Sequence, residues 1–122
     1  MESRILIVDD EPAIRALLGA TFQGAGFRVQ TAADVPEAMA RFAAEPFDVV
    51  LTDVRMPGGS GHDLVRWLAA KCPTVRALLM SGCEIDCDQC PFTRQCFVLN
   101  KPFLPKQALS AVEKLLSENG AR

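Results

Sequence analysis

Apolar residues along this chain follow two alternating patterns. Short, mainly apolar runs are typical of strands covered on both faces, and four of them occur, at Ile5–Val8, Phe47–Leu51, Val75–Met80 and Phe97–Leu99; the second and third each contain one charged residue, Asp48 and Arg76. Between these runs, apolar residues repeat every three or four positions, which predicts amphipathic helices. The helical stripes are Ile14–Phe22 (with Leu17 included), Val35–Phe42, Leu64–Ala69 and Ala108–Leu116. The patterns therefore predict strands that alternate with helices.

Residues 27–31 form a further strand of a different kind. Phe27, Val29 and Thr31 alternate with the polar residues Arg28 and Gln30. Such alternation is typical of a strand with one covered face and one exposed face. We therefore expect this strand at an edge of the sheet.

Local signals mark the ends of several elements. Asp10-Glu11-Pro12 offers a cap and a first-turn proline to the first helix. Asp34 and Glu37 have the spacing of a capping box ahead of the second helix. The segment Met56–Gly61 is expected to be a loop because it is rich in proline and glycine.

Five strands alternating with helices predict a parallel sheet with helices on both faces. With residues 27–31 at an edge, the pattern favours an α/β, flavodoxin-like (βα)5 doubly wound fold with strand order 2-1-3-4-5. The 122 residues suit a single domain, 1–122. In such sheets the functional site lies at the carboxyl ends of the strands, near the first and third.

Composition and charge narrow the classes of function. The hydrophobic fraction of 49% and the charged fraction of 23% are those of an ordinary soluble protein. A net charge of −2 argues against direct nucleic-acid binding, which needs a basic face. No apolar run approaches the roughly 20 residues that span a bilayer, and the first residues do not resemble a signal peptide. We therefore expect a cytoplasmic protein that contacts neither nucleic acid nor membrane directly.

Three aspartates, a serine and a lysine follow four of the predicted strands. Asp9 and Asp10 follow the first strand, Asp53 the third and Ser81 the fourth, and Lys101 follows the fifth. Adjacent carboxylates repel one another unless a cation lies between them, and carboxylate oxygens suit Mg²⁺. A lysine can pair with a phosphoryl oxygen, and a carboxylate can attack phosphorus to form an aspartyl phosphate. The residues therefore indicate a Mg²⁺-dependent phosphoacceptor.

Four short motifs contain these residues. They are Ile5–Glu11, Asp53 with Met56–Gly61, Ser81-Gly82 and Lys101-Pro102-Phe103. Together they resemble the response-regulator receiver domains, the CheY-like domains of two-component signalling systems. The resemblance covers nearly the whole chain.

The resemblance implies a role for each residue of the site. Asp53 would accept a phosphoryl group from a sensor histidine kinase or a phosphotransfer protein. Asp10, Asp53 and the backbone carbonyl of Arg55 would bind Mg²⁺, and Asp9 would bind it through a water molecule. Lys101 would pair with the phosphoryl group, and the Ser81 hydroxyl would turn toward it. The Lys101–Pro102 bond is similar to one that is cis in the family.

The resemblance also implies a signalling function. The domain would be a phosphorylation-dependent switch, and it would catalyse at most its own phosphorylation and dephosphorylation. Partner binding would change around a fourth helix expected between the fourth and fifth strands, the fifth strand, and the fifth and last helix, whose stripe is Ala108–Leu116. The partner would be a downstream protein or an output domain fused to this one.

The segment between the fourth and fifth strands departs from the family. Receiver domains usually form a helix here, whereas Pro91 interrupts this one, so we expect a short or irregular helix. The segment also holds Cys83, Cys87, Cys90 and Cys96. Four clustered thiols can bind zinc or an iron–sulfur cluster, form one or two disulfides, or pack as small apolar groups. An alternative function is therefore a metal- or redox-sensing module on a receiver scaffold.

One further residue departs from the receiver family, and two other classes of protein fit the sequence less well. Val98 stands where the family often has an aromatic switch residue. Haloacid-dehalogenase-type phosphatases place their nucleophile in Asp-x-Asp after the first strand, whereas Asp9 and Asp10 are adjacent. A flavin protein would need a Ser/Thr-rich phosphate loop there. His62 and Trp67, the latter on the surface or flank of the third helix, are expected to stay outside the site.

Overall fold

Strands and helices alternate in the computed structural model, which describes residues 3–53, 55–56, 59–71, 75–81, 96–100 and 104–120. The strands are β1 (Arg4–Val8), β2 (Arg28–Ala32), β3 (Val49–Asp53), β4 (Arg55–Met56), β5 (Gly59–Ser60), β6 (Arg76–Ser81) and β7 (Cys96–Asn100). The helices are α1 (Pro12–Gly24), α2 (Val35–Ala44), α3 (Gly61–Lys71) and α4 (Pro105–Gly120). No helix within these ranges is long and apolar enough to cross a membrane.

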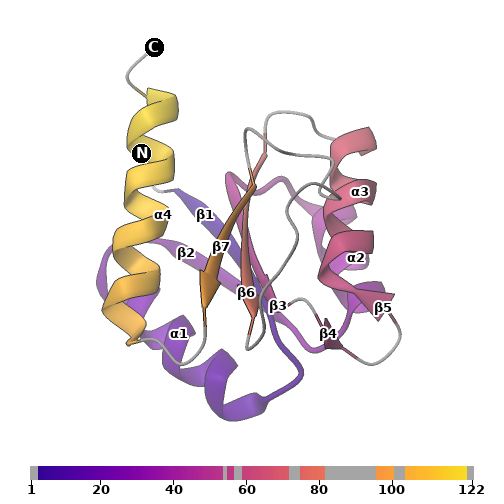
Figure 1. Cartoon of the computed structure of the whole chain (residues 1–122), viewed down its shortest axis with the longest axis horizontal. Helices are drawn as coiled ribbons and strands as arrows, with labels where there is room; N and C mark the ends of the chain where they lie inside the picture. The colour runs from indigo at the N-terminus through magenta and orange to yellow at the C-terminus, as the bar shows by residue number, and fades with distance from the viewer. Residues whose placement is uncertain are drawn as a thin grey trace.

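Five of the strands form one parallel sheet in the order β2-β1-β3-β6-β7. Counted along the chain, this is the predicted order 2-1-3-4-5, and the flavodoxin-like fold is confirmed. Helices α1 and α4 cover one face of the sheet, and α2 and α3 cover the other (Figure 1). The predicted short helix between β6 and β7 falls in residues 82–95, which lie outside the described residues.

Alternate residues of the central strands supply the two sides of the core. Leu6 and Val8 of β1 belong to a buried cluster with residues of α2 and α3. Ile5 and Ile7 belong to a second cluster with residues of α1 and α4. Since successive side chains of a strand point to opposite faces, one apolar strand fills both layers. This explains why the run Ile5–Val8 shows no alternation of apolar and polar residues.

The edge strand β2 behaves as its sequence predicts. Arg28 and Gln30 are exposed, whereas Val29 and Thr31 are partly buried and Ala32 is buried. Val29 packs against the α1–α4 cluster. The prediction of an edge strand at 27–31 is confirmed, with the strand one residue further along the chain.

The two predicted helix caps differ in outcome. The Asp34 side chain accepts a hydrogen bond from the Glu37 backbone N–H at 2.8 Å, so the cap of α2 is confirmed. The cap of α1 is Glu11, and its side chain makes no capping hydrogen bond, although Pro12 lies in the first turn as expected. Asp10 therefore is not the cap of α1, and capping does not account for an aspartate at this position.

Two smaller expectations are corrected. The segment expected as a loop contains a two-stranded antiparallel ladder that pairs Arg55 with Ser60 and Met56 with Gly59. Two-residue strands are too short to leave a periodic pattern in the sequence. Leu17, placed on the apolar stripe of α1, is 50% exposed because Leu18 and Phe22 take the face toward the sheet. Trp67 lies on the flank of α3 as expected, where it is partly buried and its ring stands edge-on to Phe42 at a centroid distance of 6.0 Å.

Candidate functional site

The register of β1 and β3 brings two aspartates together. Ile7 pairs with Leu51 and Val8 pairs with Thr52. The residue that follows Val8 is Asp9, directly after β1, and the residue that follows Thr52 is Asp53, the last residue of β3. Both aspartates continue the set of alternate residues that faces α1 and α4, because Ile7 and Leu51 belong to that cluster. Pairing of β1 with β3 therefore places both carboxylates on the same side of the sheet, at the carboxyl ends of its strands, the rim of the sheet.

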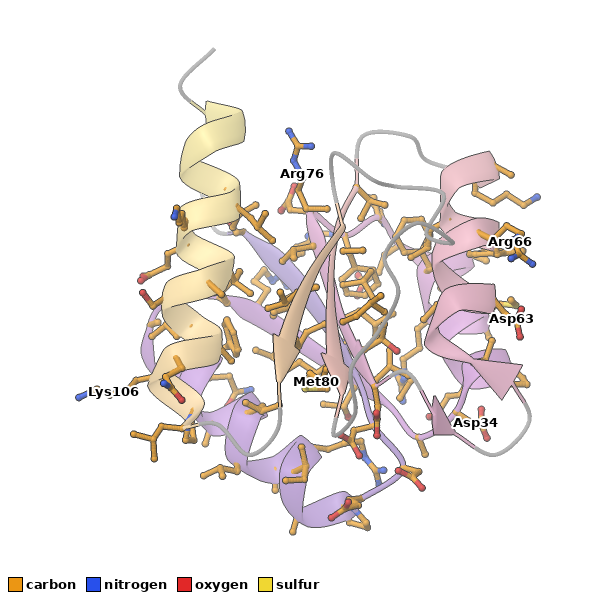
Figure 2. All side chains as sticks on the ribbon, in the orientation of Figure 1. Asp34, Asp63, Arg66, Arg76, Met80 and Lys106 are labelled. Atoms are coloured by element: carbon orange, nitrogen blue, oxygen red, sulfur yellow. The ribbon has the colours of Figure 1, made fainter. Side chains whose placement is uncertain are left out.

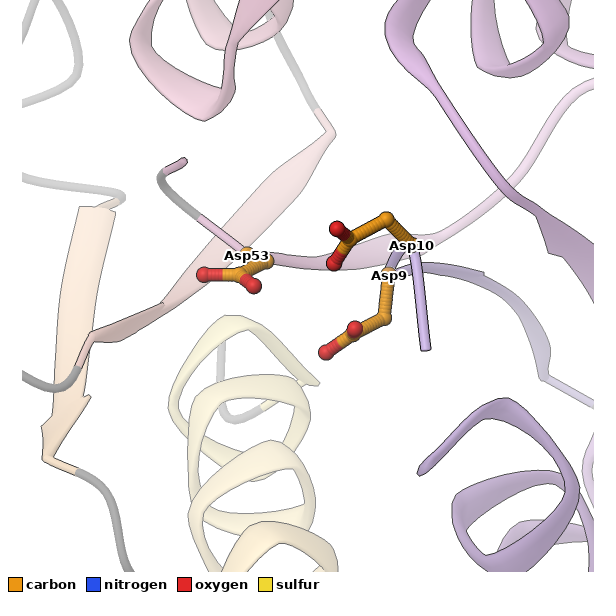
Figure 3. Close-up of side chains that lie close together, drawn as sticks. All are labelled: Asp9, Asp10 and Asp53. Atoms are coloured by element: carbon orange, nitrogen blue, oxygen red, sulfur yellow. The ribbon is translucent and has the colours of Figure 1, made fainter. Parts of the chain in front are cut away.

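Asp10 completes a group of three carboxylates at this rim. One carboxylate oxygen from each of Asp9, Asp10 and Asp53 lies within 4.8 Å of the others. Figure 3 shows the Asp9 and Asp10 side chains extending from the end of β1 toward Asp53. Asp9 is fully buried, Asp53 is partly buried and Asp10 is exposed. The group thus runs from the interior of the molecule to its surface.

Main-chain and side-chain hydrogen bonds hold Asp9 in place. Its N–H donates to the Ala32 carbonyl at the end of β2 at 3.1 Å. Its Oδ1 accepts from the Glu11 N–H at 2.9 Å, and its carbonyl oxygen accepts from Arg15 Nη1 at 2.7 Å. Asp9 is therefore fixed from β2, from the turn before α1 and from α1 itself.

The donor set of this group fits a magnesium ion. Three carboxylates at such separations repel one another, and a divalent cation between them removes that repulsion. Mg²⁺ prefers oxygen ligands and is commonly bound by one or two carboxylates with water and phosphate oxygens. A partly exposed group of this kind leaves room for such further ligands. Within the described ranges, Asp9, Asp10 and Asp53 are the residues that come together as a possible metal site.

The other residues expected at the rim are described only in part. The backbone of β6 pairs Met80 with Asp53 and Ser81 with Asn100 of β7. Ser81, the last residue of β6, therefore lies one position beyond Met80, the residue that pairs with Asp53. Arg55 follows Asp53 by two residues and begins β4. Lys101, Pro102 and the side chain of Ser81 lie outside the described residues.

The cysteine cluster also lies outside the described part of the chain. This applies to Cys83, Cys87 and Cys90, and to the side chain of Cys96, whose backbone begins β7. The expected zinc or iron–sulfur cluster thus gains no support, and neither does the metal- or redox-sensing alternative.

Arg15 is a residue near the site that the sequence patterns did not single out. It lies in the first turn of α1, is partly buried and donates to the Asp9 carbonyl at 2.7 Å. A cation at the amino end of a helix is opposed by the helix dipole. That unfavourable placement is the signal in the sequence that could have identified it.

The Glu37 carboxylate in the first turn of α2 is bound by one backbone N–H and one arginine. The Ala33 N–H donates to Glu37 Oε1 at 2.8 Å, and Arg41 Nη2 lies 3.3 Å from Glu37 Oε2. The bond from Ala33 is the main reason that the pKa of Glu37 lies below its usual value, and Arg41 and Arg15 lower the pKa further. The guanidinium of Arg15 therefore acts on the charge at the start of α2 as well as on the Asp9 main chain.

Comparison with known proteins gives consistent matches. The model of the family described as "Response regulator receiver domain" matches residues 5–113. The response regulator protein PilR of Pseudomonas aeruginosa is 47% identical over 79 residues, which cover 65% of this chain and 18% of PilR. The DNA-binding transcriptional regulator NtrC of Salmonella typhimurium is 30% identical over 115 residues, which cover 93% of this chain and 24% of NtrC. The chain thus spans about a fifth of the length of these curated relatives.

A solved structure agrees with these matches. The response regulator protein TrrA of Thermotoga maritima, solved in complex with Mg²⁺–BeF, superposes with a TM-score of 0.82 at 31% identity. The match covers 93% of this chain and 98% of the TrrA chain. Motifs, strand order, acidic rim and family match all agree, and the chain belongs to the response regulator receiver domains of two-component signalling systems.

Proposed function

We propose that this receiver domain accepts a phosphoryl group on Asp53 from a sensor histidine kinase or phosphotransfer protein, with Mg²⁺ bound at the acidic rim. The observation that carries the proposal is the convergence of Asp9, Asp10 and Asp53 within 4.8 Å at the ends of β1 and β3. TrrA, a relative of similar fold, was solved with Mg²⁺–BeF, which supports the same ligand class here.

The proposed chemistry is an in-line transfer to a carboxylate. An Asp53 oxygen attacks phosphorus, the bond from phosphorus to the donor imidazole nitrogen breaks, and the electron pair stays on that nitrogen. Asp10, Asp53 and the Arg55 carbonyl would hold Mg²⁺, and Asp9 would hold it through water. The bound cation would neutralise charge on the phosphoryl oxygens. Lys101 would pair with a phosphoryl oxygen, and the Ser81 hydroxyl would donate a hydrogen bond to another.

The output of the switch follows from the position of the rim. Ser81 ends β6 and Lys101 directly follows β7, so the phosphoryl group would act on the segment that joins these strands. We expect partner binding to change around this segment, β7 and α4. The function is regulatory, and turnover would be limited to the domain's own phosphorylation and dephosphorylation.

The receiving partner is a downstream protein or a fused output domain. NtrC is a DNA-binding transcriptional regulator, and the match covers only 24% of it, which supports an output domain in a longer protein. We propose residues 1–122 as a single receiver domain. Its net charge of −2 gives no support to direct DNA contact by the domain itself.

The test is phosphorylation by acetyl phosphate with Mg²⁺, followed by intact-mass measurement. The wild-type protein should gain the mass of one phosphoryl group, and the gain should require Mg²⁺. Asp53→Asn should gain nothing, because an amide is not a competent nucleophile. The control is Asp63→Asn, which changes an aspartate on the outer side of α3, 3.8 Å from Arg66 and away from the rim (Figure 2).

Chemical lability separates Asp53 from other acceptors. Hydroxylamine cleaves an acyl phosphate and leaves a serine or threonine phosphate intact, so it should remove the added mass. A phosphoryl gain that persists in Asp53→Asn, or one that resists hydroxylamine, would overturn the assignment.

A further inference from the structure

Arg15 occupies a position where a positive charge is unfavourable by itself. It lies in the first turn of α1, which contains no acidic residue. A cation at the amino end of a helix is disfavoured by the helix dipole relative to a neutral residue. A cation in this position therefore needs a compensating contact nearby.

Arg15 also acts on the Glu37 carboxylate at the start of α2, but its direct hydrogen bond is to the main chain of Asp9. The ladder between β1 and β2 ends at Val8 and Ala32, and the Asp9 carbonyl lies beyond it. Arg15 Nη1 donates to that carbonyl at 2.7 Å, and such charge-assisted bonds are roughly twice as strong as neutral ones. On the other side of the same residue, the Glu11 N–H donates to Asp9 Oδ1 at 2.9 Å. The Arg15 guanidinium thus links the first turn of α1 to the main chain of the segment that contains Asp9 and Asp10.

We propose that Arg15 is a positioning residue, which holds the main chain at Asp9 so that the Asp9 and Asp10 carboxylates stay directed toward Asp53. The part of this proposal that concerns Mg²⁺ rests on the proposed function. The part that concerns the conformation of residues 9–11 stands on the hydrogen bonds alone.

Two possible effects of Arg15 have opposite signs. If the residue acted only through its charge, its removal would make the rim more negative, and Mg²⁺ would bind more tightly. If it acts by positioning, its removal releases the turn, and Mg²⁺ binds more weakly in spite of the greater negative charge. Loss of a group that orients metal ligands typically lowers affinity by about 10–100-fold, so we expect a loss of about tenfold.

The experiment compares Arg15→Ala, Arg15→Lys and Arg66→Ala with the wild-type protein. Arg66 is an exposed residue of α3 that lies beside Asp63, so Arg66→Ala removes the same charge away from the turn. Calorimetric titration with MgCl₂ should show weaker binding in Arg15→Ala, partial recovery in Arg15→Lys, and equal or tighter binding in Arg66→Ala. Tighter or unchanged binding in Arg15→Ala would overturn the positioning role.

A second readout needs no metal. In metal-free protein, the Glu11 amide should exchange its hydrogen faster in Arg15→Ala than in wild type, and Arg15→Lys should restore part of the protection. Amides in the middle of β1 and β3 should be unchanged, which excludes general destabilisation. Unchanged exchange at Glu11 would overturn the proposal. If the wild-type protein bound no Mg²⁺ but Glu11 responded as expected, the proposed function would fail and the positioning of Asp9 would stand.

Discussion

At the scale of single residues, Glu37 shows how local hydrogen bonds decide the charge state of a side chain. Its carboxylate accepts from the Ala33 N–H at 2.8 Å, while its own N–H donates to Asp34. The sequence predicts this capping box from the Asp34–Glu37 spacing. The return bond, however, goes to the residue before the cap, a detail that depends on the turn between β2 and α2.

This arrangement predicts a pH-dependent contribution to stability. The pKa of Glu37 is lower in the folded protein than its usual value near 4.5, mainly because of the bond from Ala33. A lowered pKa stabilises the fold above the unfolded-state pKa, and that contribution disappears as the pH falls through the folded-state pKa. Glu37→Gln should therefore lower the free energy of unfolding at neutral pH, by only a few tenths of a kcal/mol because the side chain is well exposed.

Urea unfolding at neutral pH and at a series of lower pH values measures this effect, since Glu37 becomes protonated as the pH falls through its folded-state pKa. The difference between wild type and Glu37→Gln should shrink as the pH falls, because both side chains are neutral once Glu37 is protonated. Glu37→Ala is the control, because it also removes the acceptor for Ala33 and should remain less stable at every pH value. A constant difference between wild type and Glu37→Gln would contradict the role given to the charge.

The site residues divide into two groups by how well the sequence predicts them. Asp9, Asp10 and Asp53 are predictable because strand ends can be located from apolar runs, and parallel strands end at one rim. Arg15 was missed because its role depends on the main-chain carbonyl of Asp9. A contact with the main chain leaves no pair of side-chain types for a sequence pattern to detect.

At the scale of elements, the predictions succeed where an element carries a clear periodic pattern and fail where it is too short to show one. Strand β1 and helix α2 carry strong apolar patterns and lie within a residue or two of their predicted bounds. The β4–β5 ladder pairs only two residues on each side and was expected as a loop. Leu17 fits the helical stripe of α1, but Ile14, Leu18 and Phe22 take the face toward the sheet and leave Leu17 half exposed.

Helix α1 offers a stabilising substitution. Gly19 is buried in the helix interior, and a Cβ added there would meet Val29 Cγ1 at 3.8 Å, an ordinary van der Waals separation. Alanine restricts the unfolded chain more than glycine does. Gly19→Ala should therefore raise the free energy of unfolding by about 0.5–1 kcal/mol.

Gly26 is the matched comparison for this substitution. Its φ of +96° is a conformation that side-chain-bearing residues rarely adopt. Gly26→Ala should lower the free energy of unfolding by about 1 kcal/mol or more. Urea unfolding curves of both variants test the pair. A loss of stability in Gly19→Ala would show that α1 and β2 pack too closely for the added methyl group.

At the scale of the whole molecule, one sheet separates two apolar clusters. Trp67 packs against the cluster on the side of α2 and α3, whereas Leu78 of β6 belongs to the cluster on the side of α1 and α4. The layer arrangement was predictable from the strand and helix patterns. The division of residues between the clusters required the register of the strands.

The shared sheet predicts that both clusters unfold together. Leu78→Ala, on the side away from Trp67, should lower the free energy of unfolding by about 2–5 kcal/mol. It should shift the unfolding transition seen by Trp67 fluorescence as far as the one seen by circular dichroism, because domains of this size usually unfold in one step. Leu64→Ala, on the same side as Trp67, is the control. Separate transitions in Leu78→Ala would mean that the two layers unfold independently.

The register of β1 and β3 also bears on which length changes the chain can tolerate. Asp9 and Asp53 meet because each follows the same number of paired positions in two five-residue strands, whatever the length of the chain between them. Residues inserted beside the exposed Pro46, between α2 and β3, would lengthen a connection without changing that pairing. One residue deleted inside β3 would instead turn Asp53 toward α2 and α3 and remove it from the rim. Insertions and deletions among natural homologues should therefore gather in the connections and spare both strands.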